Sequence, residues 1–267
     1  MDTQSESSSG SPADAGGVIV RDDQSDFFPL LDAAQACRRA GGRLKIVDSG
    51  KLKISELEWL GEAGADLYTS DLARRGGGEF ILLNEAAKKG RAVAAYFHYG
   101  PFESAAGEKS VSFASLKVMG RSGLHLYVSN GRQPREFSAL GELADACLEG
   151  GSRLVFYHHG RLEPALESVV LQGAWIHVSG DSLQSEDDAA FVCDCVRAAR
   201  SQDGNIVLHV EGPLSLSWLY DIFKAGAFVL FHTPPSDYRS PQRPFELRAE
   251  QQKLDFKKYF LHRAFML

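Results

Sequence analysis

Histidine is the chemically versatile residue type that this sequence concentrates in its apolar runs. Seven of the eight histidines lie in runs that we expect to be strands: His98, His125, His158, His159, His177, His209 and His232. Neutral imidazole binds metals, and its pKa lies near neutrality, so a cluster of histidines suits a metal site or general acid–base catalysis. A single histidine of this kind is more often a hydrogen-bonded core residue, but seven together favour a site.

Glu211 is the strongest single candidate for a catalytic group. It ends an apolar run and shares a face of the expected strand with His209, so burial would raise the pKa of the carboxyl and the imidazole could hold the proton. A salt bridge at the strand end is the alternative. His98 and Asp48, at two other strand ends, complete the expected catalytic set. Asp71 comes next, although aspartate is also common at the start of a loop.

The elements that position these residues are marked by a repeated junction, in which a glycine closes a helix-like segment and an apolar run follows. The glycines are Gly42, Gly64, Gly90, Gly123, Gly151, Gly173, Gly204 and Gly226. Glycine readily takes the left-handed conformation at the end of a helix. Eight junctions from helix to strand predict an α/β fold, a single (β/α)8 TIM barrel, whose active site lies at the C-terminal ends of the strands.

The chain divides into three expected parts. Residues 1–17 are rich in serine, glycine and aspartate and predict a disordered tail. Residues 18–42 form an N-terminal extension with an extra helix, 27–40, that we expect to cover the bottom of the barrel. Residues 43–267 form the barrel, and an amphipathic helix at 245–265 ends it.

Composition limits the partners. The 267 residues are 44% hydrophobic, enough for one large core, and the formal charge of −6 argues against nucleic acid or an anionic membrane. No apolar stretch approaches the roughly 20 residues of a membrane span, and the N-terminus lacks the pattern of a signal peptide. We therefore expect a cytoplasmic protein whose four cysteines are reduced thiols.

The strand ends resemble one another about every 50 to 60 residues, as a quarter-barrel repeat would. Alternation along the strands places one set of side chains inside the barrel: Tyr68, Ser70, Tyr127, Ser129, His177 and Ser179. His159 and His232 complete the expected binding residues. For three other strands the phase stays open: either Asp48, His98 and His158 point inward, or Ser49, Tyr99 and His159 do.

Known barrel families supply no complete catalytic signature. The H-x-H motif that opens the metal site of amidohydrolases is replaced by Val47-Asp48-Ser49. The loops after the last two strands, EGPLSLS and TPPSDYRS, are not the glycine-rich phosphate loops of some barrels. Glu211 has no second carboxylate of the glycosidase type, because Gly131 follows Asn130.

Two functional hypotheses remain. The first is an enzyme of lyase, isomerase or hydrolase type that acts on a small polar molecule in a pocket lined by His, Tyr, Ser and Glu at the C-terminal ends of the strands. Its chemistry would be acid–base, and a divalent metal is a candidate cofactor. The second is a non-catalytic barrel that serves as a small-ligand sensor or as a scaffold for protein interactions. The sequence leaves the substrate and the oligomeric state open.

Overall fold

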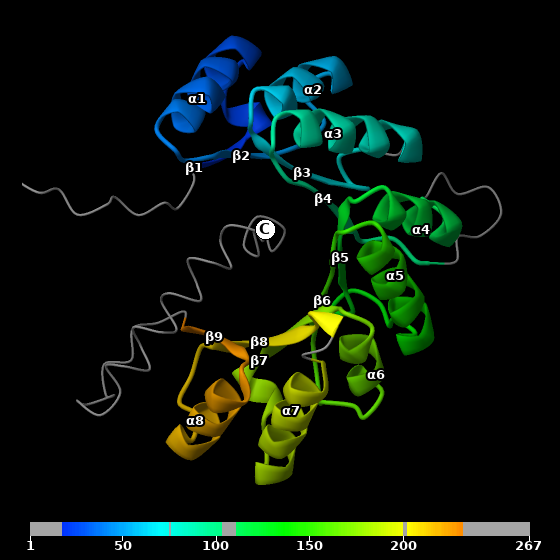
Figure 1. Ribbon diagram of the computed structural model, residues 1–267, viewed down its shortest axis with the longest axis vertical. Coiled ribbons are helices and arrows are strands. Elements are labelled where there is room, and N and C mark those ends of the chain that lie inside the picture. Colours follow the sequence, from blue (N-terminus) through cyan, green and yellow to red (C-terminus); the bar gives the residue numbers. More distant parts are fainter. Residues whose placement is uncertain (1–17, 75, 103–110, 200–201, 232–267) are drawn as a thin grey trace, which may run out of the picture.

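The computed structural model describes residues 18–74, 76–102, 111–199 and 202–231. These residues form a parallel sheet whose strands follow one another in chain order, with a helix between successive strands (Figure 1). The strands are β1 (Val18–Arg21), β2 (Leu44–Val47), β3 (Asp66–Ser70), β4 (Ala94–His98), β5 (His125–Ser129), β6 (Leu154–His158), β7 (Trp175–Ser179), β8 (Asn205–Val210) and β9 (Phe228–Phe231). The predicted α/β class and the chain-ordered βα connectivity of the TIM-barrel type are confirmed.

Eight α-helices cover the convex side of the curved sheet in Figure 1. They are α1 (Phe27–Arg39), α2 (Ile54–Glu62), α3 (Gly77–Lys89), α4 (Phe113–Arg121), α5 (Phe137–Glu149), α6 (Leu166–Leu171), α7 (Glu186–Ala199) and α8 (Leu216–Ala225). Short 3-10 helices follow β1 (Asp22–Gln24) and β7 (Gly180–Ser182).

The N-terminal extension differs from the prediction. Residues 18–21 form an additional strand, β1, which pairs in parallel with β2. The predicted extra helix exists as α1, but it connects β1 to β2 and packs beside α2 in the outer layer (Figure 1). It therefore does not cover the bottom of a barrel, because the strand before it makes it an ordinary crossover helix.

The described part of the sheet has nine strands rather than eight, with β1 and β9 at its edges. No ladder joins these two edges within the ranges that the structure describes. Two side chains of the edge strand β1 are accordingly exposed to solvent, Val18 at 58% and Ile19 at 52%.

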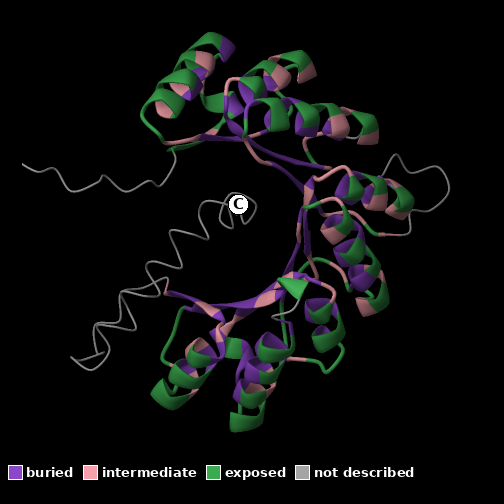
Figure 2. Ribbon diagram, viewed as in Figure 1, coloured by how far each residue is buried: buried purple, intermediate pink, exposed green. Residues whose placement is uncertain are grey.

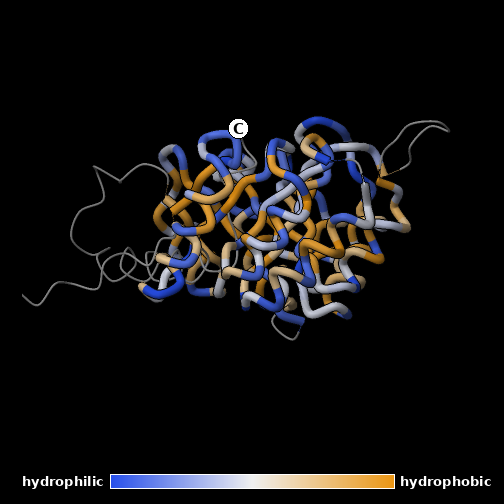
Figure 3. The backbone as a smooth tube through the Cα atoms, turned by 90° about the horizontal axis from the view of Figure 1, so that it is seen from above, coloured by the Kyte–Doolittle hydropathy of each residue, from blue (hydrophilic) through white to orange (hydrophobic). Residues whose placement is uncertain are grey.

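Alternation along the strands separates two apolar layers. Leucine, isoleucine, valine and alanine dominate the layer between the sheet and the helices, which includes Ile46, Leu126 and Ile176. Aromatic residues dominate the opposite, concave layer, which includes Tyr68 and Tyr127. Figure 2 shows the strands buried and the outer sides of the helices exposed, and Figure 3 shows apolar segments concentrated through the middle of the molecule.

The glycine junctions are confirmed as boundaries, and five of the eight glycines take the left-handed conformation: Gly64, Gly123, Gly151, Gly173 and Gly226. At the other three junctions a neighbour takes it instead: Gly41, Arg91 and Asp203. Gly90 serves close packing, because a Cβ there would collide with the carbonyl oxygen of Gly61. Glycine thus has two separate roles at these boundaries.

Several predictions fall outside the described residues: the tail at 1–17, His232 and the helix at 245–265. Within the described part of the chain, no helix is long and apolar enough to cross a membrane. All four cysteines are free thiols, and Cys147, Cys193 and Cys195 are buried.

Candidate functional site

The structure decides which alternating side chains at the ends of β2, β4 and β6 face the concave side of the sheet. Asp48 follows β2 in phase with Ile46, which packs against the helices, and the ring of His98 lies 6.1 Å from that of Tyr96, which belongs to the same layer. The ring of His158 lies 5.9 Å from that of Phe156, also on the helix side. Asp48, His98 and His158 therefore face the helices and not the concave side.

Asp48 is held in an ion pair at the end of β2. Its carboxylate accepts hydrogen bonds from Nε of Arg74 at 2.6 Å, from the hydroxyl of Thr69 at 2.7 Å and from the backbone N–H of Gly50 at 2.8 Å. Both charged side chains are largely buried, at 3% exposure for Asp48 and 10% for Arg74. This bonding stabilises the strand end and occupies the carboxylate.

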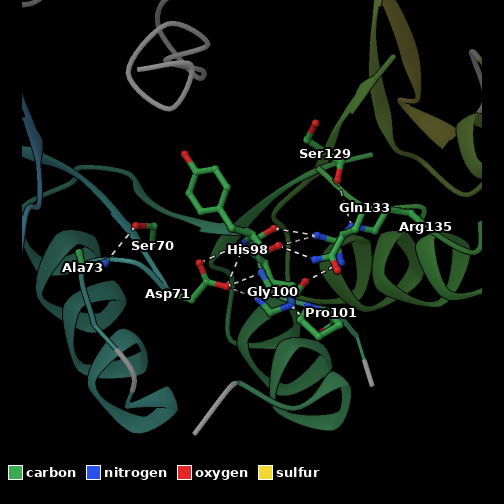
Figure 4. A network of polar contacts seen from close by, with 10 residues as sticks. Ser70, Asp71, Ala73, His98, Gly100, Pro101, Ser129, Gln133 and Arg135 are labelled. Atoms are coloured by element: carbon green, nitrogen blue, oxygen red, sulfur yellow. Dashed lines mark hydrogen bonds and ion pairs between the residues drawn. The ribbon is translucent and has the colours of Figure 1, made fainter. Parts of the chain in front are cut away.

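A second network surrounds His98 at the end of β4 (Figure 4). Nδ1 of His98 lies 3.1 Å from Oδ2 of Asp71, and Nε2 lies 3.2 Å from the carbonyl oxygen of Pro101. Arg135 donates from its guanidinium to the carbonyl oxygens of Ser129 at 3.0 Å and of Gly100 at 2.6 Å. His98 is therefore part of a packed polar cluster on the helix side of the sheet.

Asp71 belongs to a contact that recurs along the chain. In three places the residue directly after a strand accepts a hydrogen bond from a backbone N–H at the end of the next strand. The pairs are Asp22 with Ser49 N at 2.8 Å, Asp71 with Tyr99 N at 3.0 Å, and Asn130 with His159 N at 2.7 Å. The repeat that the sequence suggested thus has a geometric counterpart, and β1 takes part in it.

The concave face carries the aromatic cluster that we call the tyrosine face: Tyr68, Phe97, Tyr99, Tyr127 and Tyr157. Phe97 stacks on Tyr99 with centroids 4.2 Å apart, and it lies 6.3 Å from Tyr127 and 6.1 Å from Tyr157. The interplanar angles of these pairs are 23°, 28° and 21°. Rings from neighbouring strands therefore lie almost parallel.

The tyrosine face continues into two histidines on β7 and β8. Nδ1 of His177 and Nε2 of His209 are 2.8 Å apart, and the two residues are 2% and 7% exposed. The ring of Tyr157 lies 4.5 Å from that of His177. One nitrogen of this bond must donate and the other accept, so the two facing nitrogens share one proton. We call this the histidine pair.

Burial controls the ionisation of the phenols. It raises the pKa values of Tyr68 and Tyr157 well above the ordinary value, and the nearby hydroxyl of Tyr127 raises both further. Burial also raises the pKa of Tyr99 to about 12. All of these side chains are therefore neutral hydrogen-bonding phenols near pH 7. The hydroxyl of Tyr157 is buried, and no residue of the described ranges hydrogen-bonds to it.

Glu211 does not match its expected environment. It lies exposed after β8, and in the described residues no hydrogen bond joins it to His209, which instead bonds His177. The predicted burial of Glu211 is wrong, because the residue is exposed to solvent. Glu211, His209, His98 and Asp48 are thus not brought together.

The predicted binding residues within the described ranges fall into three groups. Tyr68, Tyr127 and His177 are buried on the concave side, as alternation predicted. The serine hydroxyls act locally, since those of Ser70, Ser129 and Ser179 accept backbone N–H groups two or three residues further on. His159 is exposed beside Asn130.

The hypothesis of a metal site can be tested by whether ligand side chains lie close together. Within the described ranges, no three His, Cys, Asp or Glu residues lie close enough to hold an ion. The sequence named Tyr99 as one of two alternatives for the concave face, but Tyr157 was not predicted to belong to it. The signal for Tyr157 was present, because Val155 and Tyr157 alternate with buried apolar residues on β6, but a neighbouring strand was needed to decide which set faces the concave side.

Comparisons with known proteins add only remote likenesses. No family model matches the chain, and no curated protein matches it in sequence. A structure of 3-dehydroquinate dehydratase from Aquifex aeolicus is 14% identical, with 92% of this chain and 99% of that chain covered and a TM-score of 0.38. A sugar phosphate isomerase/epimerase from Parabacteroides distasonis is 8% identical, with 96% and 99% covered and a TM-score of 0.37.

A putative fructose-1,6-bisphosphate aldolase from Coccidioides immitis is 14% identical, with 90% and 98% covered and a TM-score of 0.35. All three are enzymes of the TIM-barrel type. At these scores the likenesses add nothing to what the strand order shows, and the function of this chain is argued from its own residues.

Proposed function

We propose that this protein is an enzyme that moves a proton on a small, polar, uncharged molecule bound against the tyrosine face, with the histidine pair as acid and base. The observation that carries the proposal is the buried 2.8 Å contact between His177 and His209 beside the ring of Tyr157. Imidazole is the side chain best suited to exchange protons near neutral pH.

The chemistry follows from the neighbours of the pair. A neutral phenol such as Tyr157 donates a hydrogen bond to a carbonyl oxygen of the ligand. An imidazole of the pair takes the proton from the adjacent carbon, and the electrons of the broken C–H bond move onto the carbonyl oxygen. In an isomerisation the imidazolium returns the proton to the neighbouring carbon, while the proton of the hydroxyl on that carbon moves to the former carbonyl oxygen and a new carbonyl forms. In an elimination the imidazolium gives the proton to a hydroxyl on the next carbon, which leaves as water as the carbonyl forms again and a C=C bond is made. Phenol donors favour this step because they bind the developing negative charge.

The experiment measures hydrogen–deuterium exchange of dihydroxyacetone in D2O by NMR, with hydroxyacetone as a second probe. The wild type should exchange the carbon-bound protons faster than buffer, and His177→Asn and His209→Asn should each lower the rate at least about 100-fold. His158→Asn is the matched control, because this buried histidine lies on the helix side and should retain the exchange. No exchange by the wild type, or equal losses in all three variants, would refute the proposal.

A second candidate function is ligand binding without catalysis. It is favoured by the ion pair of Asp48 with Arg74 and by the exposure of Glu211, which leave neither of the two carboxylates expected from the sequence beside the histidine pair. Binding of either ketone, seen as shifts of the Tyr157 ring signals without exchange, would support this function. Binding with exchange would support the enzyme.

A further inference from the structure

We infer that Asp71 is a positioning residue: its hydrogen bonds to the backbone at the end of β4 place Tyr99 on the tyrosine face. We also infer that His98 is positively charged and that this charge keeps the carboxylate of Asp71 in place. The role in ligand binding rests on the proposed function. The geometry does not, since it is formed by the protein alone.

Asp71, which directly follows β3, binds the backbone N–H groups that follow β4. Its Oδ2 accepts the N–H of Gly100 at 2.7 Å and that of Tyr99 at 3.0 Å. A Cβ on Gly100 would lie 3.1 Å from the same carboxylate oxygen and 3.3 Å from the ring of His98, so glycine permits this close approach. Arg135, 8% exposed, completes the hold by donating to the carbonyl oxygens of Gly100, Tyr99 and His98.

The contacts of His98 favour a doubly protonated ring. Nε2 faces the carbonyl oxygen of Pro101, which only accepts, so this nitrogen carries a proton. Nδ1 lies 3.1 Å from Oδ2 of Asp71, where an unprotonated nitrogen would set its lone pair against a negative oxygen. The alignment of this second contact is poor for a hydrogen bond, so charge attraction holds the ring there.

The charged groups around His98 are consistent with an imidazolium beside a carboxylate. Asp71 faces it from the end of β3, Arg135 donates to its carbonyl oxygen, and Tyr96 lies next to it on β4. Burial of Asp71 raises the pKa of its carboxyl, but the contact with His98 and the N–H groups of Gly100 and Tyr99 outweigh burial and leave the pKa below the ordinary value. Asp71 is therefore ionised near neutral pH.

Tyr99 is the residue through which this network reaches the proposed site. It directly follows His98 but points to the other side of the sheet, where it stacks on Phe97 at 4.2 Å. The guanidinium of Arg132 lies 4.7 Å above its ring. The ring of Tyr157 lies 6.1 Å from that of Phe97, so Tyr99 and Tyr157 both lie beside the same ring of the tyrosine face.

The chain contains an uncharged counterpart of the same arrangement. At the end of β6, Oδ1 of Asn130 accepts the N–H of His159 at 2.7 Å, and Nδ2 of Asn130 faces Nδ1 of His158 at 3.3 Å. Nε2 of His158 lies 2.8 Å from the carbonyl oxygen of Arg161. The amide donates to Nδ1, so His158 keeps one proton, on Nε2. Asp71→Asn should therefore fold like the Asn130 site while removing the charge from His98.

The first test exchanges these two residues and counts ring protons by ¹⁵N-detected NMR of the histidines at pH 7. We expect two protonated nitrogens on His98 in the wild type and one in Asp71→Asn. Asn130→Asp should change His158 from one to two. A single proton on wild-type His98, or an unchanged His98 in Asp71→Asn, would overturn the inference. An unchanged His158 signal in Asp71→Asn shows that the variant is folded.

The second test measures KM and kcat for the exchange of dihydroxyacetone. Asp71→Asn should raise KM roughly tenfold with little change in kcat, because the ligand contact and not the reacting pair is displaced. In a Tyr99→Ala background, Asp71→Asn should add no further effect.

The outcomes separate the two proposals. If the wild type exchanges no probe, the proposed function fails, and the ring-proton count still decides the role of Asp71 and His98. If exchange depends on His177 while Asp71→Asn leaves KM unchanged, the positioning role is wrong and the proposed function stands.

Discussion

Replacing Tyr157 by phenylalanine should stabilise the protein and weaken its function at the same time. The hydroxyl is buried without a hydrogen-bond partner among the described residues, and the side chain is 6% exposed. An unsatisfied buried polar group costs about 1 to 3 kcal/mol. Phenylalanine removes that cost and keeps the ring contacts with Tyr127 at 6.3 Å and with His177 at 4.5 Å. The free energy of unfolding should therefore rise by about 1 to 3 kcal/mol.

The assay is urea unfolding followed by tryptophan fluorescence. With a slope of about 3 kcal/mol per M urea, the midpoint of Tyr157→Phe should rise by roughly 0.3 to 1 M. Tyr96→Phe is the matched control, because its hydroxyl is also buried without a partner in the described ranges but faces the helices. Both variants should be stabilised, and only Tyr157→Phe should lose binding or exchange of the ketone probes. A destabilisation of Tyr157→Phe by 1 kcal/mol or more would show that the folded protein already satisfies this hydroxyl, and the reasoning would be wrong.

Three further predictions concern stability. Burial lowers the pKa of His125 from 6.5 to about 4, so between pH 8 and pH 5 the unfolded state takes up a proton that the folded state does not. The free energy of unfolding should therefore fall by about 2 kcal/mol over this range, and His125→Asn should lose this dependence in urea unfolding. Gly90→Ala should cost about 3 kcal/mol because its Cβ would meet the carbonyl oxygen of Gly61, whereas Gly212→Ala, with open space around it, should change the unfolding midpoint little. Asp48→Ala should cost about 3 to 5 kcal/mol by the same measurement, since it leaves a largely buried guanidinium without its carboxylate; a loss under 1 kcal/mol would contradict the importance of that pair.

The order of strands and helices was predictable because its signals are local. A glycine that ends a helix and an apolar run that follows it are both read within about ten residues, and β2 to β9 lie where these junctions indicated. The same locality explains the missed strand. Val18–Arg21 has four residues, and the sequence before it shows neither a helix-like segment nor a glycine junction of the repeated kind, so only its pairing with β2 identifies it.

The site was less predictable because a side chain's direction depends on neighbouring strands. On β5, Leu126 and Tyr127 differ enough in polarity for alternation to decide the phase, and Tyr127 is buried on the concave face. On β4, Tyr96, Phe97 and His98 are all large and mostly apolar or aromatic, so both phases satisfied the pattern. The register with β5, which aligns Phe97 with Tyr127, decides it.

The residues most suggestive of catalysis in the sequence turn out to secure the fold. A histidine or aspartate two residues before a glycine, as at His98, His158 and Asp48, resembles a reactive group at a barrel mouth. In the structure that spacing turns the side chain behind the sheet, where it bonds the loop after its own strand: Asp48 accepts Gly50 N–H, and the two histidines face loop carbonyl oxygens. The residue between, exemplified by Tyr99, is thereby turned to the concave face. In this motif, the histidine or aspartate stabilises the strand end on the helix side, and the residue that follows it faces the concave side. Residues that contact a ligand should therefore be sought at the second of these positions.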